Sequence, residues 1–198
     1  MSQTPESIAV APSGSRIVPL VVWILVVVTL LAIPLKIISY GYVPGDDAKH
    51  HVAMVISGKA WQDIIVMRPD FVMDPSPGWH VILGAVHKAF NLDRDGLMVF
   101  SIVSMYLLFA LTPLIWTPRP ESWLLALLAG CVSIQSTDRL ALGRPYLVSM
   151  TVLVAILFLE SKPGRRSFLV PVITTVLIAL ATWIHGTWYL FAVPVAAF

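Results

Sequence analysis

Long apolar runs, separated by short polar stretches, dominate the pattern along the chain. Residues 17–38, 97–116 and 168–184 are such runs, and residues 188–198 look like the start of another. A helix needs about 20 apolar residues to cross the roughly 30 Å of hydrocarbon in a bilayer. We therefore expect the first three runs to be transmembrane helices. Because the chain stops inside the fourth, we expect it to be incomplete at the C-terminus.

Two shorter apolar runs cover residues 123–134 and 146–159. Runs of 12 and 14 residues are also typical of re-entrant or buried helices. If the helix continues through residues 136–142, the first run becomes long enough to span, and we expect both runs to be transmembrane. The predicted fold class is all-α: a polytopic helical membrane protein with about 5–6 transmembrane helices and two amphipathic surface helices.

The polar segment 41–95 lies between the first two long runs. It holds seven of the eleven acidic residues and four of the five histidines, yet it is too short and too apolar for a soluble domain. Its periodicity predicts two amphipathic helices at the membrane surface, the first over about residues 46–61. Ser76 as N-cap and Pro77 at the first helical position predict the start of the second. The apolar stripe predicted for this second helix contains Trp79, Ile82, Leu83, Val86 and Phe90, with His80 and His87 on its flank.

Composition supports a membrane location. The hydrophobic fraction is 58%, the charged fraction 12%, and mean hydropathy is +0.84. Soluble domains carry about 25% charged residues, so the chain is expected to be an integral membrane protein. The net charge of +2 is too small to argue for nucleic acid, and Cys131, the single cysteine, forms no intrachain disulfide.

The orientation follows from lysines and arginines in short loops. With the N-terminus inside, five basic residues face inward (Arg16, Arg119, Lys162, Arg165, Arg166) and two face outward (Arg139, Arg144). We therefore expect a multi-pass protein, most consistent with a bacterial inner membrane. Residues 1–16 would be a disordered cytoplasmic tail, residues 17–198 the helical domain, and segment 41–95 would lie outside. A cleaved signal peptide is disfavoured because the run 17–38 exceeds a signal core of about 7–15 residues.

Four titratable side chains gather in "GYVPGDDAKHH", directly after the first span. On a helical wheel Asp46, Asp47, His50 and His51 share one face, opposite the apolar residues. The same pattern fits a solvated polar face with an aspartate N-cap, a divalent metal site, or a general base. The sequence leaves these interpretations open.

The order of one span, an outer loop opening with this motif, two surface helices and further spans resembles the GT-C superfamily of membrane glycosyltransferases. The resemblance covers nearly all of the chain, although the motif itself is short. It implies a polyprenyl-phosphate-linked sugar donor, and Asp46 or Asp47 as the catalytic base or the group that positions the acceptor. We favour Asp46, at the very start of the helix. The histidines His50 and His51 are not a general mark of that family, so a metal-assisted variant or another function stays open.

Other residues fit a substrate site. In "DRLALGRPY", Arg139 and Arg144 are suited to bidentate contact with a donor phosphate, and lipid headgroup contact is the alternative. His185 lies between two tryptophans at the outer end of a run, where an aromatic belt is the alternative. Arg68, together with Asp70 and Asp74, is a further sugar-binding possibility. With His50 and His51, these residues complete the predicted substrate-binding set.

Three functions remain after the sequence is read. The first is an outer-face glycosyltransferase, with no certain cofactor, for which the lack of a GxGxxG or GxxxxGK[ST] loop fits a donor without a soluble nucleotide. The second is an accessory subunit of a membrane complex. The third is a metal-binding membrane protein that uses Asp46, Asp47, His50 and His51. Expected partners are membrane lipids, the lipid-linked donor and possible membrane subunits, and no nucleic acid.

Overall fold

A computed structural model describes residues 17–39, 47–65, 73–161, 168–192 and 196 of the chain. Every regular element within these ranges is helical, which confirms the predicted all-α class. The elements are α1 (Ile17–Ser39), α2 (Asp47–Ser57), α3 (Trp61–Ile64), α4 (Pro77–Phe90), α5 (Arg94–Leu111), η1 (Thr112–Ile115), α6 (Pro120–Val132), α7 (Ile134–Ala141), α8 (Tyr146–Glu160), α9 (Leu169–Ile184) and η2 (Trp188–Phe191).

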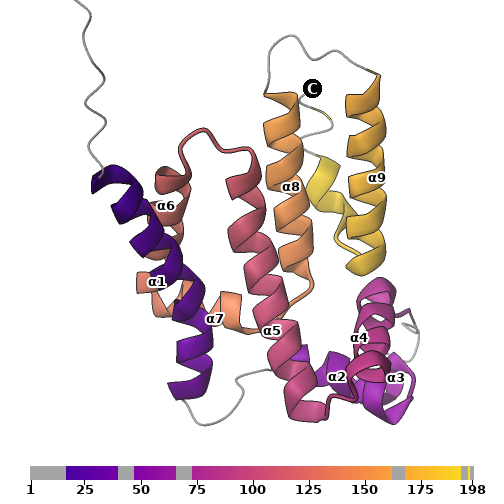
Figure 1. Cartoon of the computed structure of the whole chain (residues 1–198). Coiled ribbons are helices and arrows are strands. Elements are labelled where there is room, and N and C mark those ends of the chain that lie inside the picture. The colour runs from indigo at the N-terminus through magenta and orange to yellow at the C-terminus, as the bar shows by residue number, and fades with distance from the viewer. Residues whose placement is uncertain (1–16, 40–46, 66–72, 162–167, 193–195, 197–198) are drawn as a thin grey trace, which may run out of the picture.

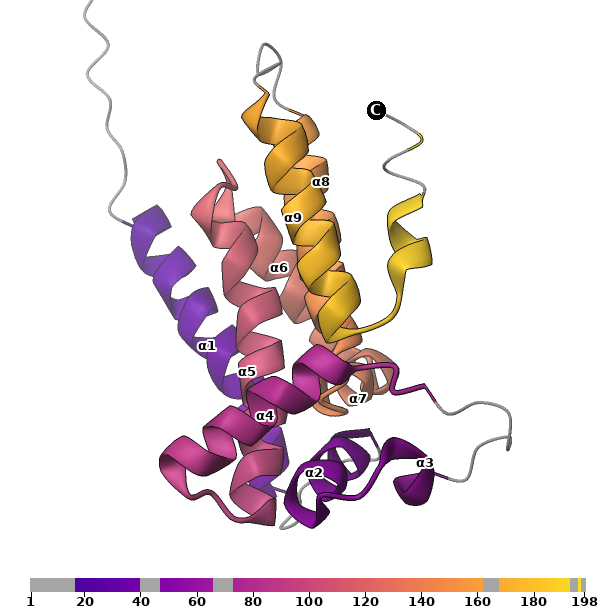
Figure 2. The same ribbon diagram turned by 90° about the vertical axis from the view of Figure 1, so that its right-hand side faces the viewer.

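The longer helices α1, α5, α6, α8 and α9 run along the molecule, whereas α2, α3 and α4 gather at one end (Figures 1 and 2). Helix α5 lies in the middle and packs against α1, α2 and α8. Its buried side chains include Leu97, Ile102, Met105 and Tyr106, all at most 1% exposed. The polar end elements therefore rest on the same core as the apolar bundle.

Two helical segments are long and apolar enough to cross a membrane, Val18–Lys36 and Arg94–Ile115, with mean hydropathies of 2.8 and 2.1. The helices α6, α8 and α9 are apolar but shorter, with 13, 15 and 16 residues. Large apolar side chains are exposed on α1, including Trp23 at 67%. These features fit a lipid surrounding, as the composition predicts.

The first surface helix ends earlier than predicted. It was expected to reach residue 61, but α2 stops at Ser57, and α3 begins separately at Trp61. Gly58 adopts φ +65°, and its N–H donates to the carbonyl of Met54 at 3.0 Å. A left-handed glycine directly after a helix is a common helix end. The second surface helix begins at Pro77 as predicted, and Asn91 at φ 50° follows its last residue.

Helix α6 does not continue through residues 136–142 as one straight spanning helix. Ser133 has an extended backbone (φ −76°, ψ 125°), and α7 starts after it. The hydroxyl of Thr137 lies 2.7 Å from the carbonyl oxygen of Cys131 and 2.9 Å from that of Ser133. The first contact provides a partner for the carbonyl of Cys131 at the break, and the carbonyl of Ser133 also accepts the backbone N–H of Thr137 at 3.0 Å.

Candidate functional site

An ion pair joins the start of α2 to the turn before α8. Nε of Arg144 lies 2.6 Å from Oδ2 of Asp47, and the two side chains are 32% and 33% exposed. Nε is buried, but its N–H is not aligned with the carboxylate oxygen. The two groups therefore attract each other by charge and do not form a well-directed hydrogen bond. Asp47 lies in the first turn of α2, where a negative charge is favourable for the helix dipole.

Gly143 brings Arg144 to this position. Its φ is +63°, and a Cβ built on it would lie 2.9 Å from Cγ1 of Ile102 and 3.1 Å from Cβ of Ala48. Only glycine combines this backbone conformation with such close contact. The turn before α8 therefore sits directly against α2 and α5, which places Arg144 beside Asp47.

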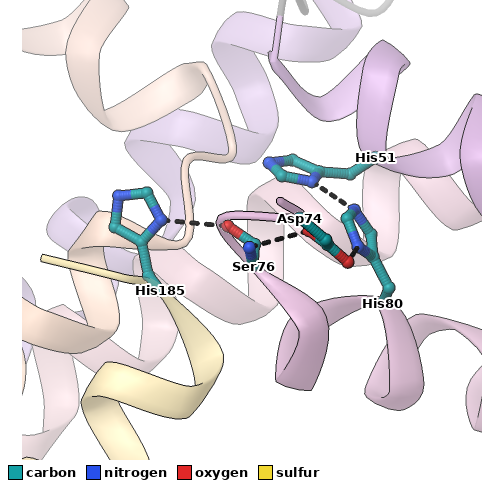
Figure 3. Close-up of polar contacts among 5 residues, drawn as sticks. All are labelled: His51, Asp74, Ser76, His80 and His185. Carbon is teal, nitrogen blue, oxygen red and sulfur yellow. Dashed lines mark hydrogen bonds and ion pairs between the residues drawn. The ribbon is translucent and has the colours of Figure 1, made fainter. Parts of the chain in front are cut away.

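A chain of hydrogen bonds joins Ser76, Asp74, His80 and His51 (Figure 3). Oδ2 of Asp74 lies 2.7 Å from Nδ1 of His80, and Nε2 of His80 lies 2.7 Å from Nδ1 of His51. The second carboxylate oxygen of Asp74 accepts from the backbone N–H of Ser76 at 2.8 Å. The chain thus links α2, the loop before α4, and α4 itself.

Trp61 covers the two imidazoles. Its ring stacks on His51 at a centroid distance of 5.1 Å and lies 5.2 Å from the ring of His80. His51 is 4% exposed and His80 is 8% exposed. The histidine pair is therefore buried. His51 does not lie on a solvated polar face, and His80 does not lie on an exposed flank of α4.

The end of α9 closes the other side of the cluster. The hydroxyl of Ser76 lies 3.0 Å from Nδ1 of His185, and the N–H of Gly186 donates to the carbonyl of Pro75 at 2.8 Å. A Cβ at Gly78 would lie 2.6 Å from the Trp183 ring, so the start of α4 packs tightly on α9. Ser76 stands at the N-cap position, as predicted, but its hydroxyl faces His185 instead of capping α4.

Burial keeps two of the histidines neutral. Burial, together with smaller contributions from His80, His185 and His50, lowers the pKa of His51 to about 3. Burial also lowers the pKa of His185; Asp47 opposes this change and Arg144 reinforces it. His185 is therefore within electrostatic reach of both the ion pair and His51.

Metal ligation finds no support among the described residues. No group of three or more histidine, cysteine, aspartate or glutamate side chains in the described ranges could hold a metal ion. Nδ1 of His51 is already engaged by His80. Asp46, one of the four residues proposed from sequence, lies outside these ranges.

The structure brings together most of the residues singled out in the sequence. Asp47, Arg144, His51 and His185 belong to one polar cluster, and His50 acts on His51 through its charge. Arg139 does not join them: it is exposed on α7 and lines a separate pocket of about 410 Å³ with Phe109, Trp123 and Tyr146. Arg68, like Asp46, lies outside the described residues.

Three members of the cluster had weaker sequence signals. His80 was expected on a helix flank, Ser76 only as an N-cap, and Asp74 only as a possible neighbour of Arg68. The Asp-Pro-Ser-Pro sequence contains the usable signal, since an aspartate side chain often accepts the backbone N–H two residues later, here that of the N-cap Ser76. Its contact with His80 needs the folded turn and is invisible in the linear pattern.

Comparison of the chain with protein-family models, with curated proteins and with solved structures finds no match in any of the three.

Proposed function

We propose that this chain is a multi-pass inner-membrane glycosyltransferase, with its N-terminus in the cytoplasm. It transfers a sugar from a polyprenyl-phosphate donor to an acceptor hydroxyl on the outer face. Asp46 and Asp47 orient and deprotonate the acceptor, and Arg144 binds the donor phosphate. Arg68 and Arg139 remain proposed contacts to substrate at the edge of this site.

The contact between Asp47 and Arg144 carries the proposal. The two residues lie 97 positions apart and were assigned to acceptor and donor, respectively, for independent reasons. Their side chains meet at 2.6 Å at the end of the bundle where α2 joins it. A carboxylate that holds a guanidinium in place leaves the other N–H groups of Arg144 for a phosphate, and preorganised charge of this kind stabilises a leaving phosphate.

An apolar cavity supports a lipid-linked donor. It has a volume of about 470 Å³ and lies between α5, α8 and α9, with Trp116, Val148, Leu177 and Ile184 among its lining residues. Val148 is one helical turn after Arg144, and Ile184 directly precedes His185. A polyprenyl chain in this cavity would bring its phosphate to the polar cluster.

The lengths and exposed apolar side chains of α8 and α9 support the proposal that these helices also span the membrane. Helix α8, with 15 residues, is about 22 Å long, which is shorter than the roughly 30 Å of hydrocarbon. Short spans are accommodated by local thinning of the bilayer and by flanking residues at its surface. Exposed apolar residues on α9, including Val176 at 52%, fit contact with lipid or with further helices.

The test is transfer of radiolabelled sugar from polyprenyl-phosphate donors by the whole protein in membranes. The double variant Asp46→Asn, Asp47→Asn should transfer sugar about 10²–10⁴-fold more slowly, the usual loss when a general base is removed. Asn caps a helix about as well as Asp, so expression should be unchanged. Asp95→Asn is the matched control, because Asp95 forms an exposed ion pair with Arg94. Full activity in the double variant would contradict the proposal and favour an accessory subunit.

A further inference from the structure

An open groove of about 710 Å³ lies between α2 and α4, at the end of the molecule where the surface helices gather (Figures 1 and 2). Gly58 and Lys59 line it from the end of α2, and Val81, Gly84 and Lys88 line it from α4. We call it the lysine groove. It is separate from the apolar cavity between α5, α8 and α9.

Small residues keep the lysine groove open. Val81, Gly84 and Lys88 follow one another at intervals of three and four residues, so they lie on one face of α4. A Cβ built on Gly84 or on Gly58 would have no neighbouring atom within 4 Å. The groove therefore exists because this face of α4 and the end of α2 lack large side chains, and a large residue at position 84 would fill it.

The charged groups of the groove favour an anionic ligand. Lys59 and Lys88 are exposed, and neither forms an ion pair with a carboxylate of the described residues. Asp74 also lines the groove, but its two carboxylate oxygens are already engaged by the backbone N–H of Ser76 and by Nδ1 of His80. Two ammonium groups thus remain for a ligand, and lysine is a common phosphate-binding residue.

The remainder of the lining favours a lipid over a carbohydrate. The other described residues around the groove are aliphatic or small, and Val81 is 60% exposed. An alkyl chain would be removed from water on such a floor, whereas a sugar hydroxyl would lose its bonds to water without gaining a partner. Met73 and Phe90, each 71% exposed on the same end elements, also fit contact with a membrane surface.

We propose that the lysine groove binds an anionic phospholipid. Its phosphate lies at Lys59 and Lys88, and part of an acyl chain lies along Val81 and Gly84. The bound lipid fastens α2 and α4 to each other and to the membrane surface beside the polar cluster. This site rests on the proposed membrane location and does not require sugar transfer.

Native mass spectrometry of the whole protein, released from detergent micelles, tests lipid binding directly. The protein is titrated with palmitoyl-oleoyl phosphatidylglycerol, with the phosphatidylcholine of the same chains, or with inorganic phosphate. One phosphatidylglycerol should bind roughly 10-fold more tightly than phosphatidylcholine, because two lysines attract its net negative charge. Inorganic phosphate, which has no chain, should not displace it. Equal affinity for the two lipids, or displacement by phosphate alone, would overturn the inference.

Charge variants show whether the two lysines hold the headgroup. Lys59→Gln and Lys88→Gln should each weaken phosphatidylglycerol binding roughly 5-fold, the usual effect of one basic residue near an anionic lipid surface. Lys49→Gln is the matched control, because Lys49 is exposed on α2 but does not line the groove. An equal loss of affinity in Lys49→Gln would mean that overall charge, and not the groove, attracts the lipid, and the inference would be wrong.

A cavity-filling variant locates the lipid in the groove. Gly84→Leu places a large side chain in the open space and suits a helix, so the protein should fold with an unchanged or higher Tm and lose its preference for phosphatidylglycerol. Gly130→Leu, at an equally open glycine of α6, should keep that preference. Unchanged phosphatidylglycerol affinity in Gly84→Leu would contradict the site. Lipid binding by an unsubstituted protein that transfers no sugar would retain the site and contradict only the transferase.

Discussion

Nδ1 of His51 and Nε2 of His80 share a hydrogen bond while Trp61 covers the ring of His51, and these contacts explain how a polar face of α2 can be buried. A buried imidazole is stable in a fold only when it is hydrogen-bonded and neutral. His80 and Asp74 supply the bonding, and the lowered pKa of His51, about 3, keeps the ring neutral. The helical wheel shows the shared face of these residues but not their partners, which follow 23 and 29 residues later.

The protein should lose stability in acid through His51. Its folded-state pKa of about 3 lies below the unfolded value of 6.5, so the unfolded chain binds more protons between these values. The contribution is present above pH 6.5 and is lost as the pH falls toward 3. Thermal unfolding in detergent micelles at pH 7.5 and pH 5 measures this loss.

The variant His51→Asn isolates the effect of this one residue. The difference in Tm between the unsubstituted protein and His51→Asn should shrink from pH 7.5 to pH 5, because only the unsubstituted protein carries the acid-sensitive imidazole. A Tm difference that is the same at both pH values would show that His51 does not carry the acid sensitivity.

At the scale of elements, helix starts were more predictable than helix ends and breaks. Pro77 marks the start of α4 in the sequence and in the structure. Gly58, which follows the last residue of α2, is a recognisable helix-end signal in the sequence. The apolar pattern nevertheless extended the predicted helix to residue 61. The break at Ser133 depends on contacts of Thr137 with carbonyls of the preceding turns, and no local pattern announces it.

The site depends on Gly143, which lies in the turn before α8 and packs against α2 and α5. In Gly143→Ala the positive φ costs about 1–2 kcal/mol, and crowding against Ile102 and Ala48 adds about 1–3 kcal/mol. The variant should therefore unfold at a lower temperature and transfer sugar more slowly, because the turn that presents Arg144 must move. Thermal unfolding and the transfer assay measure the two effects.

Two other glycines serve as controls for this prediction. Gly58 has a positive φ but open space around its Cβ position, so Gly58→Ala should cost only the backbone strain. Gly84, within α4, also has open space, and Gly84→Ala should be neutral or stabilise the helix by about 0.5–1 kcal/mol. If Gly143→Ala is no more damaging than Gly58→Ala, the junction is not tightly packed.

At the scale of the whole molecule, the polar cluster lies at one end of an apolar bundle, and the turn between α5 and α6 lies at the other (Figures 1 and 2). Composition and apolar runs predicted this division, because they depend on many residues at once. The site depends on a few contacts between distant segments. For that reason the sequence placed Asp47 and His51 on one helix face but indicated Arg144 and His185 only separately.

The orientation prediction places α3 outside and the turn before α6 inside. Asp63 on α3 and Arg119 before α6 are both exposed. In a Cys131→Ser background, Asp63→Cys should react with a membrane-impermeant maleimide in intact cells, and Arg119→Cys should react only after the cells are opened. The reverse pattern would contradict the short-loop charge argument and the outer-face location of the site.

A double-substitution cycle on the sugar-transfer rate, with Asp47→Asn, Arg144→Gln and both together, tests the central claim that this pair forms one site. Each single substitution should slow transfer roughly 10- to 100-fold, since a close pair of opposite charges contributes on the order of 1.5–3 kcal/mol. The double variant should be about as slow as the slower single variant, because the same interaction is lost in all three. If the two losses multiply, or if either single variant transfers sugar at the unsubstituted rate, Asp47 and Arg144 do not act as a unit and the account is wrong.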